Sequence, residues 1–160
     1  AAEFGLPYAF ASHFAPAQLL PALEIYRARF KPSAQLARPY AMVGVNIIAA
    51  DTEQEARRLA TTQQMSFTNI FRGARGLSKP PIDDIETYWS PMEKVQAMQM
   101  LARTIIGDRE QVRSGIAELV RGTGADELMI VSDIYDHRAR LHSYALIAEA
   151  GSDAKTAAEA

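Results

Sequence analysis

Polar residues that could do chemistry stand at or near the carboxyl ends of three apolar runs. They are Ser12, His13, Asn46, Ser132, Asp133 and Tyr135. A serine, a histidine and an aspartate could form a hydrolytic triad. However, adjacent residues of a strand point to opposite faces, so His13 is badly placed to deprotonate Ser12. The G-x-S-x-G motif that exposes a nucleophilic serine is also absent.

Metal and phosphate sites find weak support in the sequence. His13, Asp133 and His137 could ligate a metal ion, but Asp133 and Asp136 are explained more simply as capping residues of a following helix. The chain has no cysteine, which excludes disulfides and zinc–thiolate sites. No glycine-rich phosphate motif is present, and the RGARG segment at 72–76 could cradle an anion but reads more simply as a flexible loop.

Asn46 is the one polar residue inside the apolar run MVGVNIIAA. A buried amide that finds no hydrogen-bond partner costs about 1–3 kcal/mol. Gly44 shares its face of the strand and would leave room for something flat or bulky. Asn46 is therefore either a polar plug in a packed interior or a ligand contact, and the two interpretations are equally favoured.

The elements that must position these residues follow from the apolar pattern. The runs 8–12, 40–50 and 127–133 do not alternate with polar residues, which predicts buried strands. Helix-capping residues precede several of the helical patterns: Thr52 with Glu55, Ser90 with Glu93, Asp108 with Gln111, and Asp136. The predicted helices cover residues 16–30, 53–71, 91–103, 109–122 and 137–149.

The alternation of strands and helices predicts an α/β fold with a parallel sheet. GLPYAFAS and GADELMIVS share a plan of glycine, turn, apolar strand and serine, as expected for a repeated βα unit. Both a doubly wound sheet and a (β/α)8 barrel fit this order, and both place ligand sites at the carboxyl ends of the strands. The segment 72–90 has no helical or strand period, and the small polar residues of 151–160 predict a disordered tail.

Composition narrows the function classes. The formal charge of −2 and the absence of a basic stripe argue against a nucleic-acid partner. Apolar stretches of about ten residues are too short to span a membrane. The absence of cysteine and of a signal-peptide pattern favours a cytoplasmic protein.

Three stretches of the chain resemble the bacterial luciferase-like flavin monooxygenases. They are AAEFGLPYAFASHFAP, GVNIIAADTEQEARRLA and the region from IIGDREQV to SYALIAEA. The resemblance covers residues 1–150 and implies a (β/α)8 barrel of which the chain carries the C-terminal part, about strands six to eight. It also implies reduced FMN, or in one branch a deazaflavin, as the cofactor that activates oxygen. The small-residue loop that holds the flavin phosphate in this family would precede the chain.

The resemblance assigns roles to single positions. His13 stands where luciferase and alkanesulfonate monooxygenase have a tryptophan near the flavin ring. Gly44 and Asn46 stand where the second enzyme has an active-site arginine and histidine, which argues against a sulfonate substrate. Tyr135 matches an active-site tyrosine, and 72–90 corresponds to a mobile insertion over the active site.

We therefore expect a flavin-dependent monooxygenase that acts on a small organic substrate and O2. Ser12, His13 and Asn46 would bind the cofactor, Tyr135 would be catalytic, and no metal is expected. A flavin reductase could supply electrons, and a homo-oligomer is expected. The alternatives are an inactive αβ assembly module, a deazaflavin-dependent hydride-transfer enzyme on the same barrel and, last, a serine hydrolase.

Overall fold

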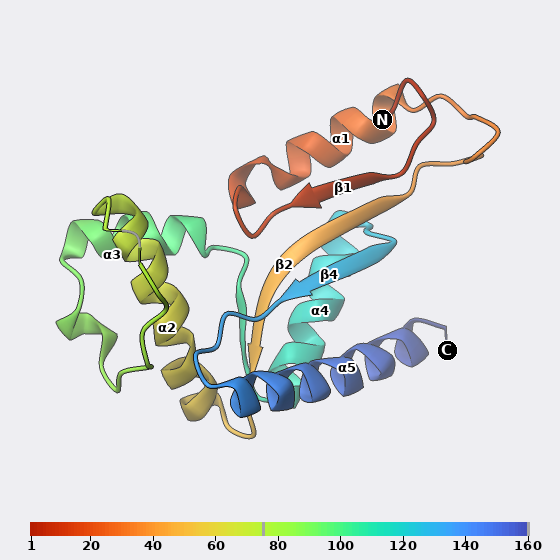
Figure 1. The fold of residues 1–160 in the computed structure, drawn as a ribbon. Helices are drawn as coiled ribbons and strands as arrows, with labels where there is room; N and C mark the ends of the chain where they lie inside the picture. The colour runs from red at the N-terminus through yellow and green to blue at the C-terminus, as the bar shows by residue number, and fades with distance from the viewer. Residues whose placement is uncertain (75, 160) are drawn as a thin grey trace.

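The computed structural model describes the backbone of residues 1–74 and 76–159, and the side chains up to Ser152 with Arg75 left out. Two short 3-10 helices accompany the strands and α-helices, and Figure 1 shows how the elements are arranged. In chain order the elements are β1 (Tyr8–Ala11), η1 (Pro16–Gln18), α1 (Leu19–Arg29), β2 (Ala41–Ala49), α2 (Glu53–Phe71), η2 (Ile85–Thr87), α3 (Pro91–Met100), β3 (Ile105–Gly107), α4 (Arg109–Thr123), β4 (Glu127–Val131) and α5 (His137–Glu159).

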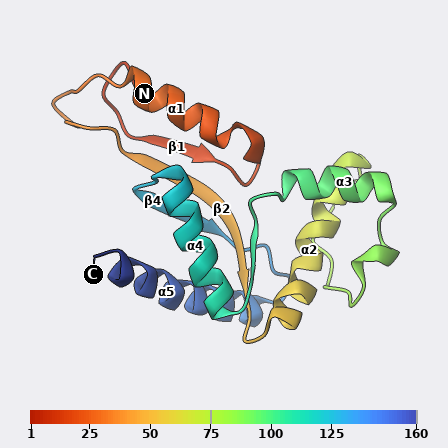
Figure 2. The ribbon, with the colours of Figure 1, turned by 180° about the vertical axis from the view of Figure 1, so that it is seen from behind.

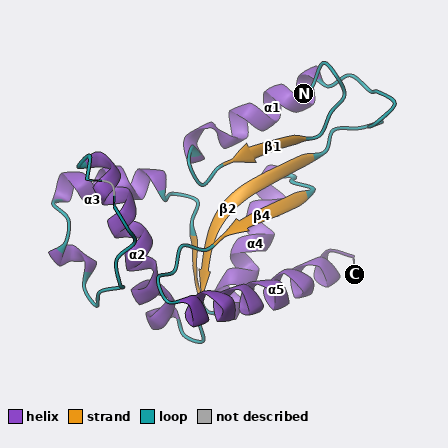
Figure 3. Ribbon diagram, viewed as in Figure 1, coloured by secondary structure: helices purple, strands orange, loops and turns teal. Residues whose placement is uncertain are grey.

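The strands form a parallel sheet with β2 at its centre (Figure 3). β1 pairs with the first half of β2, with Tyr8 opposite Ala41. β4 pairs with almost the same stretch, with Met42 opposite Glu127, so β1 and β4 flank β2 on opposite sides. The short β3 extends the sheet along the end of β2, from Ile47 to Ala49. The predicted α/β class with a parallel sheet is confirmed.

One face of the sheet is covered by α1, α4 and α5. Alternate residues of β2, from Val43 to Ala49, pack against Leu23 of α1, Ile116 of α4 and Ile147 of α5. Figure 2 shows α4 crossing in front of β2 and β4 on this face. Because strand side chains alternate between faces, these apolar positions form the main core of the molecule.

The opposite face is covered only near the carboxyl ends of the strands. There Ile48 packs against Ala56 and Leu59 of α2 and against Ile134. Further back along the strands the side chains of Ala9, Ala11 and Met129 are exposed. The strand ends and α2 therefore enclose a corner of the fold in which polar residues can be partly buried.

Four of the predicted helices, α2 to α5, start where expected because their caps form. Ser90 with Glu93 and Asp108 with Gln111 make complete capping boxes at α3 and α4. Thr52 accepts a hydrogen bond from the backbone of Glu55, and Asp136 accepts one from the backbone of Ala139 at 2.8 Å. The end of α4 also follows the predicted plan, since Gly124 adopts a left-handed conformation with φ of 57°.

The helix ends and one strand differ from the sequence predictions. The helix expected over 16–30 begins as a 3-10 turn and is α-helical only over Leu19–Arg29. α3 ends at Met100 rather than at 103, and α5 continues from 149 to Glu159, into the part predicted as a disordered tail. The strand β3 was missed because three residues are too few to show a period.

The segment 72–90, expected to be a mobile insertion, packs back on α2. The hydroxyl of Thr62 donates a hydrogen bond to the carbonyl of Lys79 at 2.9 Å, and the hydroxyl of Thr61 accepts one from Ile82 N at 2.9 Å. Trp89 is buried beside Phe67. The anion site considered at 72–76 includes Arg75, which lies outside the described residues.

Candidate functional site

Ser12 and His13 point to opposite faces at the end of β1, as the alternation of a strand requires. Ser12 is 1% exposed, and its hydroxyl donates a hydrogen bond of 2.6 Å to the carbonyl oxygen of Gly44. His13 lies over the other side of Gly44, where a Cβ atom would be only 2.8 Å from Nδ1 of the imidazole. The flat group for which Gly44 leaves room is thus the ring of His13.

His13 and Asn46 line one pocket of about 420 Å³ at the carboxyl ends of β1, β2 and β4. Asp133, which follows β4, also lines it. The other walls come from Gln63 and Phe67 of α2, from Arg140 and Tyr144 of α5, and from Phe14. The pocket therefore combines three aromatic rings, two amide side chains, an imidazole, a carboxyl group and a guanidinium group.

The charged groups of this pocket influence each other. Burial raises the pKa of the Asp133 carboxyl, and the positive charge of Arg140 opposes part of that rise. The Arg140 guanidinium lies 3.1 Å from Nδ1 of His137. Asp133 thus keeps its proton to a higher pH than an ordinary aspartate does.

Ser132 lies at the end of β4 as Ser12 lies at the end of β1. Ser132 is buried, its backbone N–H donates to the hydroxyl of Tyr144 at 3.2 Å, and its own hydroxyl lies 3.4 Å from that of Ser143. Both strand-end serines therefore join strands to neighbouring backbone or helix. Neither is arranged as the nucleophile of a hydrolytic triad.

Two other predicted positions lie outside the pocket. Tyr135 is 52% exposed and is not among the residues that line it. His137 contacts Arg140 on the surface of α5. Among the described residues no group of histidine, aspartate and glutamate side chains could hold a metal ion. The structure thus brings His13 and Asn46 together and leaves Tyr135 and His137 apart from them.

The sequence analysis missed the residues that the helices contribute. Gln63 is buried although it stands in the polar-looking stretch ATTQQMS of α2. A glutamine at a buried position of an amphipathic helix is the available signal, and it requires the correct helical phase to be recognised. Arg140 and Tyr144 lie one turn apart on α5, and nothing in their spacing distinguishes them from surface residues.

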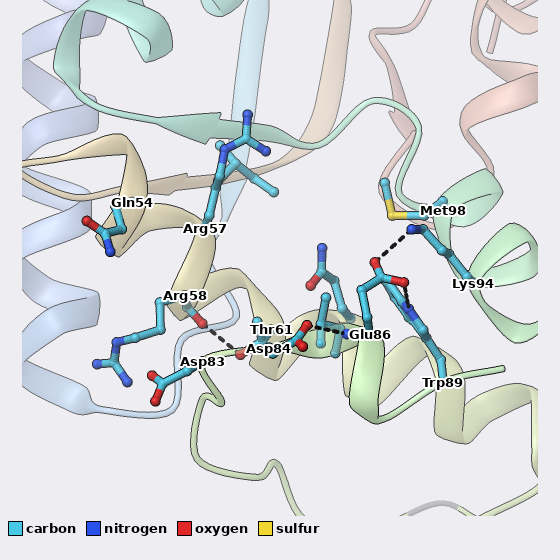
Figure 4. A pocket seen from close by; sticks show the side chains of 13 residues that line it. Gln54, Arg57, Arg58, Thr61, Asp83, Asp84, Glu86, Trp89, Lys94 and Met98 are labelled. Carbon is cyan, nitrogen blue, oxygen red and sulfur yellow. Dashed lines mark hydrogen bonds and ion pairs between the residues drawn. The ribbon is translucent and has the colours of Figure 1, made fainter. Parts of the chain in front are cut away.

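A second pocket of about 490 Å³ lies between α2, the segment around η2 and α3 (Figure 4). Several of its charged groups are paired. Lys94 lies 2.7 Å from Glu86, which also accepts a hydrogen bond of 3.2 Å from Trp89 Nε1. Arg57 lies 2.6 Å from Glu53. This pocket shares no lining residue with the one at the strand ends.

A parallel α/β sheet with a polar pocket at its carboxyl edge is typical of the enzymes built on repeated βα units. Residues 1–127 match the sequence model of the family described as luciferase-like monooxygenase. The chain belongs to this family, and the resemblance predicted from the sequence is confirmed. In the described residues, none of the helices is both long and apolar enough to cross a membrane.

The relatives agree with this assignment. A luciferase-like monooxygenase of Escherichia coli K12 is 49% identical over 146 residues, which cover 91% of this chain and 44% of that protein. The uncharacterized protein YvbT of Bacillus subtilis is 46% identical, with 93% of this chain and 44% of the relative covered. The chain therefore spans less than half the length of these relatives.

Two solved structures have a similar fold. The crystal structure of apo-MsnO8 superposes with a TM-score of 0.76 and 30% identity, covering 95% of this chain and 46% of that one. The monooxygenase RslO1 from Streptomyces bottropensis superposes with a TM-score of 0.58 and 17% identity, covering 91% and 40%. The second likeness concerns the fold alone.

Proposed function

We propose that the whole protein is a flavin-dependent monooxygenase that uses reduced FMN and O2 to oxidise a small organic substrate. In this proposal the chain forms the C-terminal part of a (β/α)8 barrel, about strands six to eight. The observation that carries the proposal is the pocket at the strand ends, which His13 and Asn46 line. The chain belongs to the luciferase-like monooxygenase family, which supports the same proposal. A flavin reductase as electron donor and a cytoplasmic location remain predictions.

The residues of the pocket suit a flavin. A flavin ring is flat and carries hydrogen-bond donors and acceptors along one edge. Phe14 and Phe67 offer aromatic surface, while the amides of Asn46 and Gln63 can both donate and accept. When bound, reduced FMN supplies the electrons that activate O2, and the protein contributes position, polarity and exclusion of water.

The chain's own residues take separate roles in this proposal. His13 and Asn46 hold the flavin through polar contacts. Ser12 supports the pocket from behind by fixing the backbone of Gly44. Asp133 and Arg140 orient the substrate and handle a proton at the pocket wall. Tyr135 is kept as a candidate catalytic residue of the whole protein, for which Tyr135→Phe should lower turnover while leaving FMN affinity unchanged.

Fluorescence titration of the whole protein with FMN tests the pocket. We expect His13→Ala and Asn46→Ala each to weaken FMN binding by about tenfold, the equivalent of about 1.4 kcal/mol for one lost polar contact. Gln64→Ala, in the second pocket, is the matched control and should leave the affinity unchanged. Unchanged affinity and turnover in both pocket variants would exclude this assignment. Parallel titration with a deazaflavin distinguishes the two cofactors.

The exposed edges of the sheet favour one alternative, in which the 160-residue chain is an inactive assembly module. Among the described strands, β1 and β4 each pair with β2 and with no other strand. Open parallel edges favour association with another chain or with a second copy. Titration of the isolated chain separates the two readings, because saturable quenching of flavin fluorescence would contradict an inert module.

A further inference from the structure

His13 and Asn46, which line the open pocket, also line a small second gap. Thr104, between α3 and β3, lines this gap together with Ser12, Asn46 and Arg103. Nδ1 of His13 and Oγ1 of Thr104 are both buried side-chain atoms without a hydrogen-bond partner. Two residues with such atoms line the same gap, which is unusual because buried polar groups in folded proteins are nearly always paired.

Neither a water molecule nor the hydroxyl of Ser12 satisfies these atoms. The gap has no room for a water molecule. The hydroxyl of Ser12 is engaged with Gly44 O, and Nε of Arg103 donates to Pro16 O at 3.2 Å. A threonine hydroxyl can turn about χ1 and both donates and accepts, while a neutral imidazole nitrogen accepts when it carries no proton.

We propose that Thr104 is a positioning residue for His13, its hydroxyl donating a hydrogen bond to Nδ1. This bond keeps Nδ1 as the acceptor and the proton on Nε2. Nε2 is then the nitrogen that offers a donor to a ligand in the pocket at the strand ends, which His13 also lines. The role of Thr104 in holding a ligand rests on the proposed function, whereas the hydrogen bond itself does not.

Nitrogen-15 NMR of the histidine rings tests the bond at alkaline pH, where histidine is neutral. The chain has three histidines, and the signals that His13→Asn removes are those of His13. We expect Thr104→Val to move both ring-nitrogen shifts of His13 toward the values of a free imidazole, which exchanges between tautomers. Thr104→Ser, which keeps the hydroxyl, should restore the shifts of the parent protein.

Arg103→Gln, which changes a different polar side chain at the gap, is the control and should leave the His13 shifts in place. Circular dichroism establishes that each variant is folded. The proposal is overturned if folded Thr104→Val keeps the parent shifts, or if Thr104→Ser moves them as far as Thr104→Val does.

FMN titration of the same variants tests the positioning role separately. In the whole protein, weaker binding by Thr104→Val and recovery by Thr104→Ser support it, while unchanged binding by Thr104→Val overturns it. If the parent protein binds no flavin, the proposed function fails, and the tautomer of His13 still decides whether the hydrogen bond exists.

Discussion

At the scale of single residues, Ser12 and His13 make different contacts because adjacent residues of a strand point to opposite faces. Ser12 holds the backbone of β2 from the helix-covered face, and His13 lies against the open pocket. Both depend on Gly44, whose carbonyl accepts from the hydroxyl of Ser12 and from the backbone N–H of His13. Gly44 therefore links the hydrogen bond of Ser12 to the position of the His13 ring.

Ser12→Ala should lower the free energy of unfolding by about 1–2 kcal/mol, since it removes a buried hydrogen bond and leaves the carbonyl of Gly44 with one donor. Chemical denaturation measures the loss. Ser78→Ala, at an exposed position, should change the stability by less than about 0.5 kcal/mol. An equal effect of the two substitutions would contradict the structural role of Ser12.

Gly44→Ala should displace the imidazole of His13, because the new Cβ would lie 2.8 Å from Nδ1 and 2.9 Å from Cε1. We expect a loss of stability of about 1–3 kcal/mol from overpacking, and weaker flavin binding by the whole protein. Gly122→Ala in α4 meets nothing within 4 Å and should be neutral or stabilising by up to about 1 kcal/mol. Denaturation and FMN titration of both variants check this prediction.

The strand-borne part of the pocket could be predicted from the sequence, because the carboxyl ends of parallel strands meet at one edge. That reasoning brings His13 and Asn46 together. It does not reach Gln63 or Arg140, whose presence depends on how α2 and α5 are rotated against the sheet. Tyr135 does not line this pocket, and its catalytic role stays a prediction.

At the scale of elements, one side chain fixes the start of α3. Glu93 accepts a hydrogen bond from the backbone N–H of Ser90 at 2.7 Å and another from Nε of Arg72, beyond the end of α2, at 2.6 Å. Arg72 also donates to the carbonyl of Tyr88 at 2.8 Å. The ends of α2 and α3 are thus tied together around the segment that separates them.

The hydrogen bonds from Arg72 first, and then from Ser90, lower the pKa of Glu93 to about 2. Because this value lies below the ordinary glutamate pKa of about 4.3, the bonds contribute stability above that pH. The contribution is lost as the pH falls toward about 2. Glu93→Gln should lower the melting temperature near neutral pH and reduce its further decrease on acidification. Thermal unfolding followed by circular dichroism across this range measures both effects.

Glu3→Gln, at an exposed position near the N-terminus, is the control for removing one carboxylate. The melting temperature of this variant should decrease on acidification as much as that of the parent protein. If Glu93→Gln and the parent lost stability in parallel over the same pH range, the hydrogen bonds of Glu93 would not be the cause of the acid-induced loss of stability.

Long helices that begin with a capping residue were predictable from the sequence. The short strand β3 and the C-terminal end of α5 were not. α2 has the bounds that its pattern predicts, and α4 begins at its predicted cap and ends one residue later. β3 forms because Ile105 and Ile106 pair with the end of β2, a tertiary contact for which the local sequence carries no signal. The continuation of α5 past Gly151 was also not predicted from the sequence, since one glycine weakens a helix without ending it.

At the scale of the whole molecule, one face of the sheet is covered by helices and the other is largely exposed. α1, α4 and α5 bury the first, whereas the second is covered only where α2 meets the strand ends. Met129 of β4 is 52% exposed on that second face. A parallel sheet is normally covered on both faces, so this arrangement predicts association with further protein.

The isolated chain should therefore form dimers or larger species at micromolar concentrations, through the open face and the unpaired edges of β1 and β4. Ala9→Lys with Met129→Lys places two charges on that face and should shift the chain toward the monomer, because a charge buried in an interface without a partner is costly. Sedimentation velocity measures the distribution. Ala148→Lys, on the exposed surface of α5, adds a charge elsewhere and should leave association unchanged. A parent chain that stays monomeric, or equal effects of the two kinds of variant, would mean that the open face does not drive assembly.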